Sequence, residues 1–182
     1  MKTICVFLAD GFEELEALTQ VDVFRRADLP VKTVSIKDVP TVTGSHGVTV
    51  IADMILSELD ENDVEMIVLP GGMPGSTNLD ADKTLSELLV RFASSQKPIS
   101  AICAAPFILG KRGMLTGRKA TCYPGFERFL SGADYTAALV EKDGNIITGK
   151  GPGAALDFAF TIAEKYCGKN KVDEIRNAMM IQ

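Results

Sequence analysis

Histidine is almost absent from this chain of 182 residues, and cysteine is sparse. The only histidine is His46, so a metal site rich in histidine is excluded. The four cysteines, at positions 5, 103, 122 and 167, show no Cys-x-x-Cys spacing. This spacing indicates neither a zinc site nor a disulfide framework. We therefore expect no metal site, and thiols that stay reduced.

Long hydrophobic runs and an excess of basic residues are also lacking. The apolar run near the N-terminus, Ile4 to Ala9, lies between Lys2 and Asp10 and is too short for a signal sequence or a membrane span. The 19 lysines and arginines are scattered and are outnumbered by 24 acidic residues. Such a surface favours neither nucleic acid nor an anionic membrane. We expect a cytoplasmic protein with a single domain over residues 1–182, a length typical of one domain.

Apolar segments with the periods of strands and helices alternate along the chain. The patterns predict strands at residues 3–9, 31–36, 48–51, 63–69, 98–102, 137–140 and 145–148. They predict helices at residues 13–27, 82–94, 104–110, 154–167 and 169–182. This alternation is typical of an α/β fold with a mainly parallel central sheet and helices on both faces. In such a fold, ligands bind beyond the carboxyl ends of the strands.

Cys103 stands where a predicted strand meets a predicted helix. The helix begins at once, near Pro106, which suits a first helical turn because no donor is needed there. A side chain at such a turn is exposed on a tight and often strained backbone. The start of a helix also favours an anion and so lowers a thiol pKa. Cys103 is thus a candidate nucleophile, and the alternative is a buried cysteine that packs as a small apolar residue.

Two consecutive glycines, Gly71 and Gly72, follow the predicted strand at residues 63–69. Glycine permits unusual backbone dihedrals, and its amide can point at an oxyanion or a carbonyl oxygen. A simple tight turn is the alternative. A phosphate cradle is not indicated, because neither GxGxxG nor GxxxxGK[ST] is present.

Acidic residues open the first predicted helix. Glu13 and Glu14 are interpreted as complements to the helix dipole. Glu16 lies one turn before Gln20 on the same helix face. A carboxyl group beside a thiolate would be protonated, with a raised pKa, and could exchange protons with a substrate. The pattern by itself does not favour Glu16 over Glu14.

Five short motifs extend the pattern over nearly the whole chain. They are ADGFEELE at residues 9–16, VDVFRRA at 21–27, VLPGG at 68–72, AICAAP at 101–106 and TGKGPG at 148–153. In this order and spacing they resemble the ThiJ/PfpI superfamily, and its DJ-1-like branch in particular. The resemblance implies a flavodoxin-like three-layer sandwich with a nucleophile elbow, usually assembled as a homodimer.

The resemblance also assigns roles to individual residues. It implies Cys103 as the nucleophile and Glu16 as the protonated acid that is hydrogen-bonded to it. The backbone amides of Gly72 and Ala104, with Gly71 beside them, would form the oxyanion and substrate-binding site.

Two positions depart from the family pattern. Peptidase-like members carry a histidine directly after the cysteine, and Ala104 in that place argues against proteolysis. Some DJ-1-like members have a histidine near the nucleophile where this chain has Tyr123, which can donate a hydrogen bond but is a poor general base. Tyr123, Pro152 and Gly153 are candidate site-lining residues.

His46 lies in a Gly-Ser-His-Gly turn, where related members often have an arginine near the dimer contact. We interpret it as a turn or interface residue. Whether His46 or Tyr123 assists catalysis stays open at this stage.

The expected function is chemistry on small aldehydes without a cofactor. The resemblance carries an association with glutathione-independent glyoxalase and protein deglycase activities, so methylglyoxal, glyoxal and glycated amines or thiols are the expected substrates. The alternative is a redox-sensing stress or chaperone protein that is not an enzyme. In that alternative, Cys103 is oxidised to a sulfinate, which Glu16 and the helix start would stabilise.

Overall fold

A seven-stranded sheet runs through the centre of the molecule. The structure is a computed structural model, and it describes residues 1–181. The strand order is β10-β11-β7-β6-β1-β2-β5, and all neighbours are parallel except β10 and β11. These strands are β10 (Val140–Asp143), β11 (Ile146–Gly149), β7 (Ile99–Ile102), β6 (Val64–Leu69), β1 (Thr3–Leu8), β2 (Val31–Ser35) and β5 (Met54–Ile55). The sheet confirms the expected mainly parallel α/β architecture.

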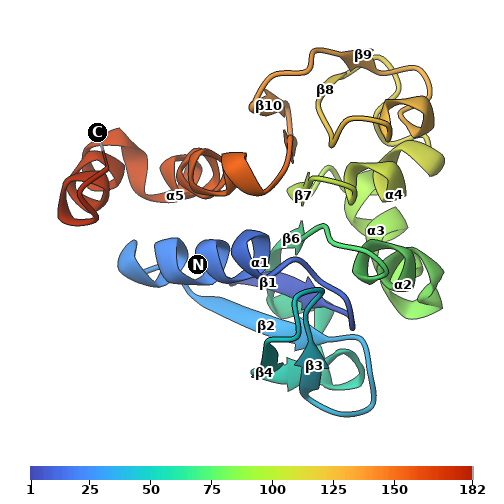
Figure 1. Cartoon of the computed structure of the whole chain (residues 1–182), viewed down its shortest axis with the longest axis horizontal. Coiled ribbons are helices and arrows are strands. Elements are labelled where there is room, and N and C mark those ends of the chain that lie inside the picture. Colours follow the sequence, from blue (N-terminus) through green and yellow to red (C-terminus); the bar gives the residue numbers. More distant parts are fainter. Residues whose placement is uncertain (182) are drawn as a thin grey trace.

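Helices cover both faces of the sheet, as Figure 1 shows. On one side lie α1 (Glu14–Arg26) and α5 (Ala155–Ala178), which pack against each other. On the other side lie α2 (Gly75–Ala81), α3 (Lys83–Ser94) and α4 (Pro106–Lys111). Both faces of the sheet are therefore shielded from water, and for this reason the central strands consist of continuous apolar runs.

The alternation of side chains along β1 separates the two hydrophobic cores. Ile4, Val6 and Leu8 belong to the core beneath α1 and α5, whereas Cys5 and Phe7 belong to the core beneath α3 and α4. All five side chains are fully buried. Successive residues of a strand point to opposite faces, so one strand supplies both layers. The expectation that Cys5 is a core residue is confirmed.

Two small sheets lie outside the central one. The strand predicted at residues 48–51 is β4 (Thr49–Ile51), which pairs with β3 (Thr41–Thr43) in an antiparallel hairpin. The second small sheet pairs β8 (Lys119–Ala120) with β9 (Asp134–Tyr135). Short 3-10 turns complete the structure: η1 (Leu56–Glu58), η2 (Glu61–Asp63), η3 (Glu127–Phe129) and η4 (Pro152–Ala154).

The last third of the chain differs in detail from the prediction. The hairpin strand expected at residues 137–140 is instead β10, because Ala137 has a left-handed backbone and the turn falls at Gly144. The two helices expected at the C-terminus form α5, with a kink at Gly168, where φ is +79°. A left-handed residue cannot continue a helix, and glycine adopts that conformation without a steric penalty. Across residues 1–181, none of the helices has the length and hydropathy needed to cross a membrane.

Candidate active site

The turn at Cys103 has the geometry that the sequence predicts. Cys103 follows β7 directly, and its φ of +65° is unusual for a residue with a side chain. Its backbone N–H donates to Gly149 O at 2.9 Å, and its carbonyl accepts from Tyr123 N at 2.8 Å. Both neighbouring segments thus hold the turn in its strained conformation.

Glu16 reaches the same place from α1. Its side chain is fully buried, and Oε2 accepts a hydrogen bond from the Gly71 amide at 2.7 Å. The start of α1 is fixed by Glu13, whose carboxylate caps the helix by accepting from the Glu16 backbone N–H at 2.7 Å. Oε1 of Glu16 has no hydrogen-bond partner among residues 1–181.

Gly71 is the point at which the two functional side chains meet. A Cβ added to Gly71 would lie 2.6 Å from Cβ of Cys103, 2.6 Å from Oε2 of Glu16 and 3.1 Å from Sγ of Cys103. These separations are too short for any side chain, so only glycine leaves room for the thiol and the carboxyl group. The structure therefore brings Cys103, Glu16 and Gly71 together, as the sequence predicts.

The thiol and the carboxyl group compete for one negative charge. Burial raises the pKa of Glu16 to about 7, although the hydrogen bonds with Cys103 and the Gly71 amide oppose this shift. Burial and the charge of Glu16 raise the pKa of Cys103, and the amides of Ala104 and Gly72 lower it by less. The expectation that the helix start makes this thiol acidic is thus wrong while Glu16 is ionised. Once Glu16 holds a proton, the repulsion disappears and its O–H can donate to the thiolate.

The oxyanion prediction needs one correction. The amides of Gly72 and Ala104 are directed at the Cys103 sulfur, where they could also stabilise an oxyanion. The amide of Gly71 is instead occupied by Glu16, so Gly71 orients the acid and does not serve as a free donor. Gly72 has a φ of +87°, and a Cβ there would collide with the backbone of Glu13.

The three predicted site-lining residues share one cavity. Tyr123, Pro152 and Gly153 line a cavity of about 260 Å³ together with Pro124, Leu139, Lys150, Gly151 and Ala154. Tyr123 is half exposed and touches this cavity with its ring, while its backbone amide holds Cys103. Cys103 does not itself line the cavity, so these residues border the elbow from one side.

Two acidic residues have a role that the sequence analysis missed. Glu13 and Glu14 are buried, whereas charges that only complement a helix dipole lie in solvent. Oε1 of Glu14 accepts from the backbone amides of His46 at 2.8 Å and Val48 at 3.3 Å. Its Oε2 lies 2.8 Å from Nδ1 of His46. Glu14 therefore anchors the β3–β4 turn onto α1, which confirms His46 as a turn residue.

These contacts set the charges of Glu14 and His46. Burial opposes ionisation of Glu14, but the hydrogen bonds from the His46 side chain and from backbone amides lower the pKa of Glu14 to about 2. The Glu14 carboxylate in turn raises the pKa of His46. No local sequence signal links Glu14 to His46, because the two residues lie 32 positions apart in the chain.

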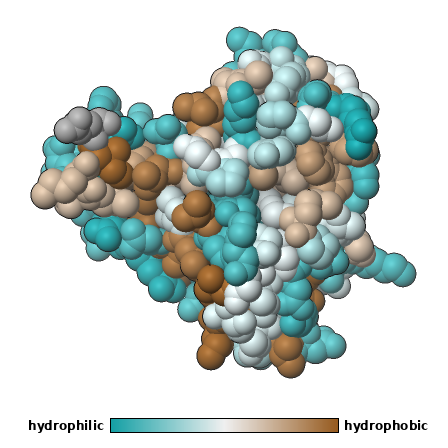
Figure 2. Space-filling view, viewed as in Figure 1, coloured by the Kyte–Doolittle hydropathy of each residue, from teal (hydrophilic) through white to brown (hydrophobic). Residues whose placement is uncertain are grey.

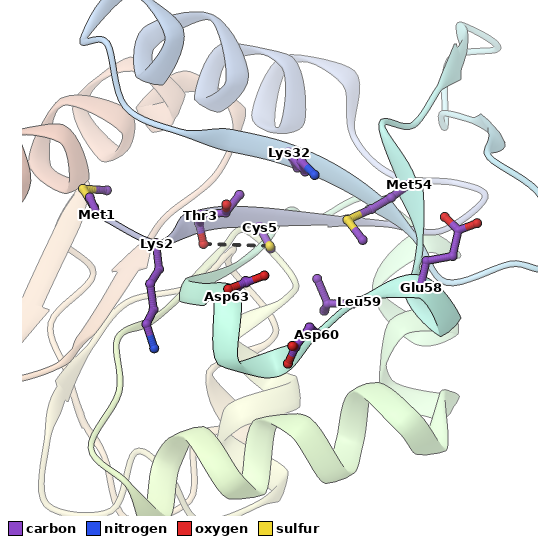
Figure 3. A pocket seen from close by; sticks show the side chains of 10 residues that line it. All are labelled: Met1, Lys2, Thr3, Cys5, Lys32, Met54, Glu58, Leu59, Asp60 and Asp63. Atoms are coloured by element: carbon purple, nitrogen blue, oxygen red, sulfur yellow. Dashed lines mark hydrogen bonds between the residues drawn. The ribbon is translucent and has the colours of Figure 1, made fainter.

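The remaining cysteines do not resemble Cys103. Cys5 lies beside a cavity of about 350 Å³ near the amino-terminal end of β1, shown in Figure 3. Within residues 1–181, the only hydrogen bond of its thiol is a long one of 3.9 Å to Thr3 O. Burial raises the pKa of Cys5 and of Cys122 to about 12 in each case. Cys167 is partly exposed, as expected. The cavity beside Cys5 lies at the opposite ends of the strands from the turn at Cys103.

Comparison with known proteins gives full-length matches. The sequence profile described as "DJ-1/PfpI family" matches residues 2–165. "Protein dj-1beta" of Drosophila melanogaster is 36% identical over 182 residues, covering 99% of this chain and 97% of the relative. "Protein DJ-1 homolog A" of Arabidopsis thaliana is also 36% identical, but this chain spans only 47% of its length.

Solved structures show the same similarity in three dimensions. A DJ-1 superfamily protein from Salmonella typhimurium has a TM-score of 0.94 at 34% identity, with both chains covered completely. Drosophila melanogaster DJ-1beta also has a TM-score of 0.94, at 36% identity, covering 100% of this chain and 98% of that one. The fold is thus the flavodoxin-like sandwich that these structures share. With the elbow, the buried acid and the full-length match in agreement, the chain belongs to the DJ-1/PfpI family.

Proposed function

We propose that this chain is a cysteine-dependent enzyme of the glutathione-independent glyoxalase or deglycase type. Its substrates would be methylglyoxal, glyoxal or their early adducts with amines and thiols. The observation that carries the proposal is the meeting of Cys103 and Glu16 above Gly71. A nucleophile next to a carboxyl group with a pKa near neutrality can both add to an aldehyde and move a proton.

The first step would form a covalent adduct with the aldehyde. Transfer of the Cys103 proton to Glu16 gives a thiolate, which attacks the aldehyde carbon C1 of methylglyoxal. The resulting alkoxide takes the proton from Glu16 and becomes a hemithioacetal. The amides of Gly72 and Ala104 would stabilise the oxyanion as it develops.

The second step would rearrange the adduct internally. The Glu16 carboxylate removes the hydrogen from C1, which gives an enediol, and returns a proton to C2. This transfer oxidises C1 to a thioester and reduces the C2 ketone to an alcohol. Water then cleaves the thioester, releasing lactate and the free thiol. Glyoxal would give glycolate in the same way, and no step requires a metal or an organic cofactor.

The test is lactate formation from methylglyoxal in the absence of glutathione. We expect turnover by the wild type and its loss in both Cys103→Ser and Glu16→Gln. Separate assays for D- and L-lactate would report the face from which C2 receives its proton. Wild-type rates in Cys103→Ser would contradict the proposal. Assays on glycated amines need a control for removal of free aldehyde, because both activities use the same nucleophile.

A second candidate is redox sensing through Cys103. A solved relative with 32% identity is described as "Toxoplasma gondii DJ-1, oxidized". In this chain, Glu16 and the amides of Gly72 and Ala104 surround the sulfur and could hold the oxygens of a sulfinate. Mass spectrometry after mild peroxide treatment should then find Cys103 oxidised first. Preferential oxidation of Cys167 would exclude this role.

We further propose that the chain forms a homodimer through the face that carries α1 and the β3–β4 hairpin. Figure 2 shows hydrophobic residues in a broken band on the face with α5, α1 and this hairpin. Large apolar side chains exposed on these elements include Leu15, Leu18, Ile51 and Leu156. Exposed clusters of this kind mark association surfaces. Sedimentation should give a dimer for the wild type and a monomer for Leu15→Glu with Ile51→Glu.

The cell compartment and the domain organisation are also proposals. Four free thiols suit the reducing cytoplasm. One domain over residues 1–182 agrees with the single central sheet that both cores share. Small reactive aldehydes and a second copy of the chain are the partners we propose.

A further inference from the structure

Three phenylalanine rings form a cluster between α4 and η3. Phe107 comes from α4, and Phe126 and Phe129 come from the segment around η3. The centroids of each pair of rings lie 5.9–6.0 Å apart, a spacing typical of attractive aromatic packing. Phe107 is buried, whereas Phe126 and Phe129 are half-buried. The phenylalanine cluster is therefore packed on one side and open on the other.

The open side of the cluster borders a cavity of about 250 Å³. The three rings line this cavity together with Met73, Thr77, Lys111 and Arg128. Pockets for drug-sized ligands have volumes of roughly 300–1,000 Å³, so this cavity suits a smaller group, of about the size of one ring. Within residues 1–181, none of the lining residues belongs to α1, α5 or the β3–β4 hairpin. The proposed dimer face therefore leaves the cavity open, and Figure 1 shows α4 across the sheet from α1.

The backbone connects the walls of the cavity to the surroundings of Cys103. Met73 directly follows Gly72, and the Gly72 amide is directed at the Cys103 sulfur. The Phe107 amide donates to Ala104 O at 3.0 Å, and the Ala104 amide is directed at the same sulfur. Two walls of the cavity are thus continuous with the two amides of the proposed oxyanion site.

The charges along the cavity favour an anionic ligand. Nζ of Lys111 lies 4.7 Å from the ring centroid of Phe107, and Cζ of Arg128 lies 4.8 Å from that of Phe129. A cationic ligand would meet two like charges, and these two rings already pack against cations of the protein itself. No aspartate or glutamate of residues 1–181 lines the cavity.

Arg128 is the cation with unused hydrogen-bonding capacity. Lys111 already donates to Asp80 at 2.8 Å. The guanidinium of Arg128 forms no ion pair and donates no hydrogen bond within residues 1–181, and its neighbour Glu127 accepts from the Gly125 amide instead. A guanidinium presents two parallel N–H groups that match the two oxygens of a carboxylate.

We propose that this cavity is a substrate subsite, which selects 2-oxoaldehydes that carry an aromatic ring with a carboxylate. The ring packs against the phenylalanine cluster, the carboxylate pairs with Arg128, and the aldehyde carbon lies at Cys103. The chemistry at C1 and C2 is that of methylglyoxal, with the aryl group in place of the methyl group. The aldehyde part of this inference rests on the proposed function, whereas recognition of the ring and its anion requires no turnover.

The kinetic test compares phenylglyoxal with 4-carboxyphenylglyoxal, which differ only in the carboxylate. The products, mandelate and 4-carboxymandelate, are measured by chromatography as initial rates, and intact mass spectrometry checks that no arginine has reacted with the aldehyde. We expect kcat/KM to be roughly tenfold or more higher for the carboxylate compound, because charge-assisted bidentate hydrogen bonds are strong. Equal values for the two substrates would overturn the proposal.

Variants assign this preference to Arg128. Arg128→Gln should abolish the preference, and Arg128→Lys should keep part of it, because the charge remains but the planar fork is lost. Arg91→Gln is the matched control, since it removes the same charge from a side chain on α3 that is 49% exposed. This control should keep the wild-type ratio of the two kcat/KM values. An unchanged ratio in Arg128→Gln would contradict the assignment.

Binding of an unreactive analogue tests the subsite without turnover. In 4-(hydroxyacetyl)benzoate an alcohol replaces the aldehyde, and α-hydroxyacetophenone is its uncharged counterpart. Calorimetry on the wild type should show one site per chain, with tighter binding of the carboxylate compound. Arg128→Gln should weaken binding of the carboxylate compound only, whereas Phe126→Leu, which removes one ring of the cluster, should weaken binding of both. Thermal melts check that the variants are folded.

The subsite and the proposed function can fail separately. Turnover of methylglyoxal, with no preference for the carboxylate substrate and no binding of the analogue, would overturn the subsite alone. A lack of turnover for every aldehyde, with analogue binding that depends on Arg128 and Phe126, would overturn the proposed function and support the subsite. Analogue binding that neither variant weakens would refute the subsite in either case.

Discussion

Gly71 N lies 2.7 Å from Oε2 of Glu16, so one glycine both leaves space for the buried acid and fixes its orientation. A Cβ added to the same residue would lie 2.6 Å from Cβ of Cys103. Gly71 therefore determines the relative position of the nucleophile and the acid without any side chain of its own.

Gly71→Ala should abolish most of the activity. The new methyl group would lie 2.6 Å from both Cβ of Cys103 and Oε2 of Glu16, so the two groups must separate. A displacement of about 1 Å in a catalytic pair costs on the order of a hundredfold in rate. The measurement is kcat/KM for methylglyoxal, with circular dichroism to confirm the fold.

Gly117→Asn is the matched control for this change. No atom lies within 4 Å of a Cβ at Gly117, and its φ of +73° is one that asparagine tolerates. This variant should retain the wild-type rate. Equal rates in Gly71→Ala and Gly117→Asn would show that the crowding at Gly71 is not important for catalysis.

The buried acid should make stability depend on pH in an unusual direction. The folded pKa of Glu16, about 7, is above its ordinary value of 4.5. Below pH 4.5, Glu16 is protonated in both the folded and the unfolded protein, so its burial does not lower the free energy of unfolding. Between pH 4.5 and 7, Glu16 loses its proton first in the unfolded protein, and the free energy of unfolding falls as the pH rises. The loss should be about 3 kcal/mol.

Urea unfolding at pH 4.5 and pH 8 checks this prediction. Glu16→Gln, which cannot ionise, should remove most of the decrease between the two pH values. If the wild type were as stable at pH 8 as at pH 4.5 and did not differ from Glu16→Gln, the pKa of Glu16 would not be raised in the folded protein.

The sequence predicts the elbow well because the relevant signals are local. A buried strand, Cys103 and a helix start occur within ten residues, and the backbone at Cys103 follows from that order. The helix at Gly75–Ala81 is not predicted, because it lacks such a local signal. Leu79 is its only large buried residue, and no apolar period is visible. Local patterns thus predict elements only where an apolar face is present.

Contacts between distant segments could not be predicted in this way. Helix periodicity does not favour Glu16 over Glu14, and it gives no sign that Glu13 and Glu14 are buried. Their burial depends on the β3–β4 turn folding over the start of α1, and Glu14 meets His46 across 32 residues. The choice of Glu16 as the acid came from the family resemblance, and the shielded position of Glu14 came only from the structure.

The ion pair of Asp80 with Arg112 should contribute more to stability than the other surface pairs. Nη1 of Arg112 and Oδ1 of Asp80 lie 2.6 Å apart, and both side chains are less than a fifth exposed. Arg112 also donates to Ser86 and to two backbone carbonyls, which links α2, α3 and α4. Asp80→Ala leaves this guanidinium without its anion and should cost about 2 kcal/mol.

Asp22→Ala is the control for Asp80→Ala. Asp22 pairs with Arg26 on α1 at 2.8 Å, but both side chains are about half exposed. Such a pair contributes roughly 0.5 kcal/mol or less. Urea unfolding of the two variants should separate them clearly, and equal losses would refute the argument from burial.

Strain at the nucleophile gives the last prediction. An L-residue with a side chain at a φ of +65° is less stable than glycine there by roughly 1 kcal/mol. We therefore expect Cys103→Gly to be more stable than Cys103→Ala in urea unfolding. Cys122 is fully buried but has no positive φ, so Cys122→Gly should be less stable than Cys122→Ala, because glycine there adds only conformational freedom to the unfolded chain. The same order at both positions would mean that the elbow stores no strain, whereas opposite orders would show that the fold holds its nucleophile in a conformation that the residue itself disfavours.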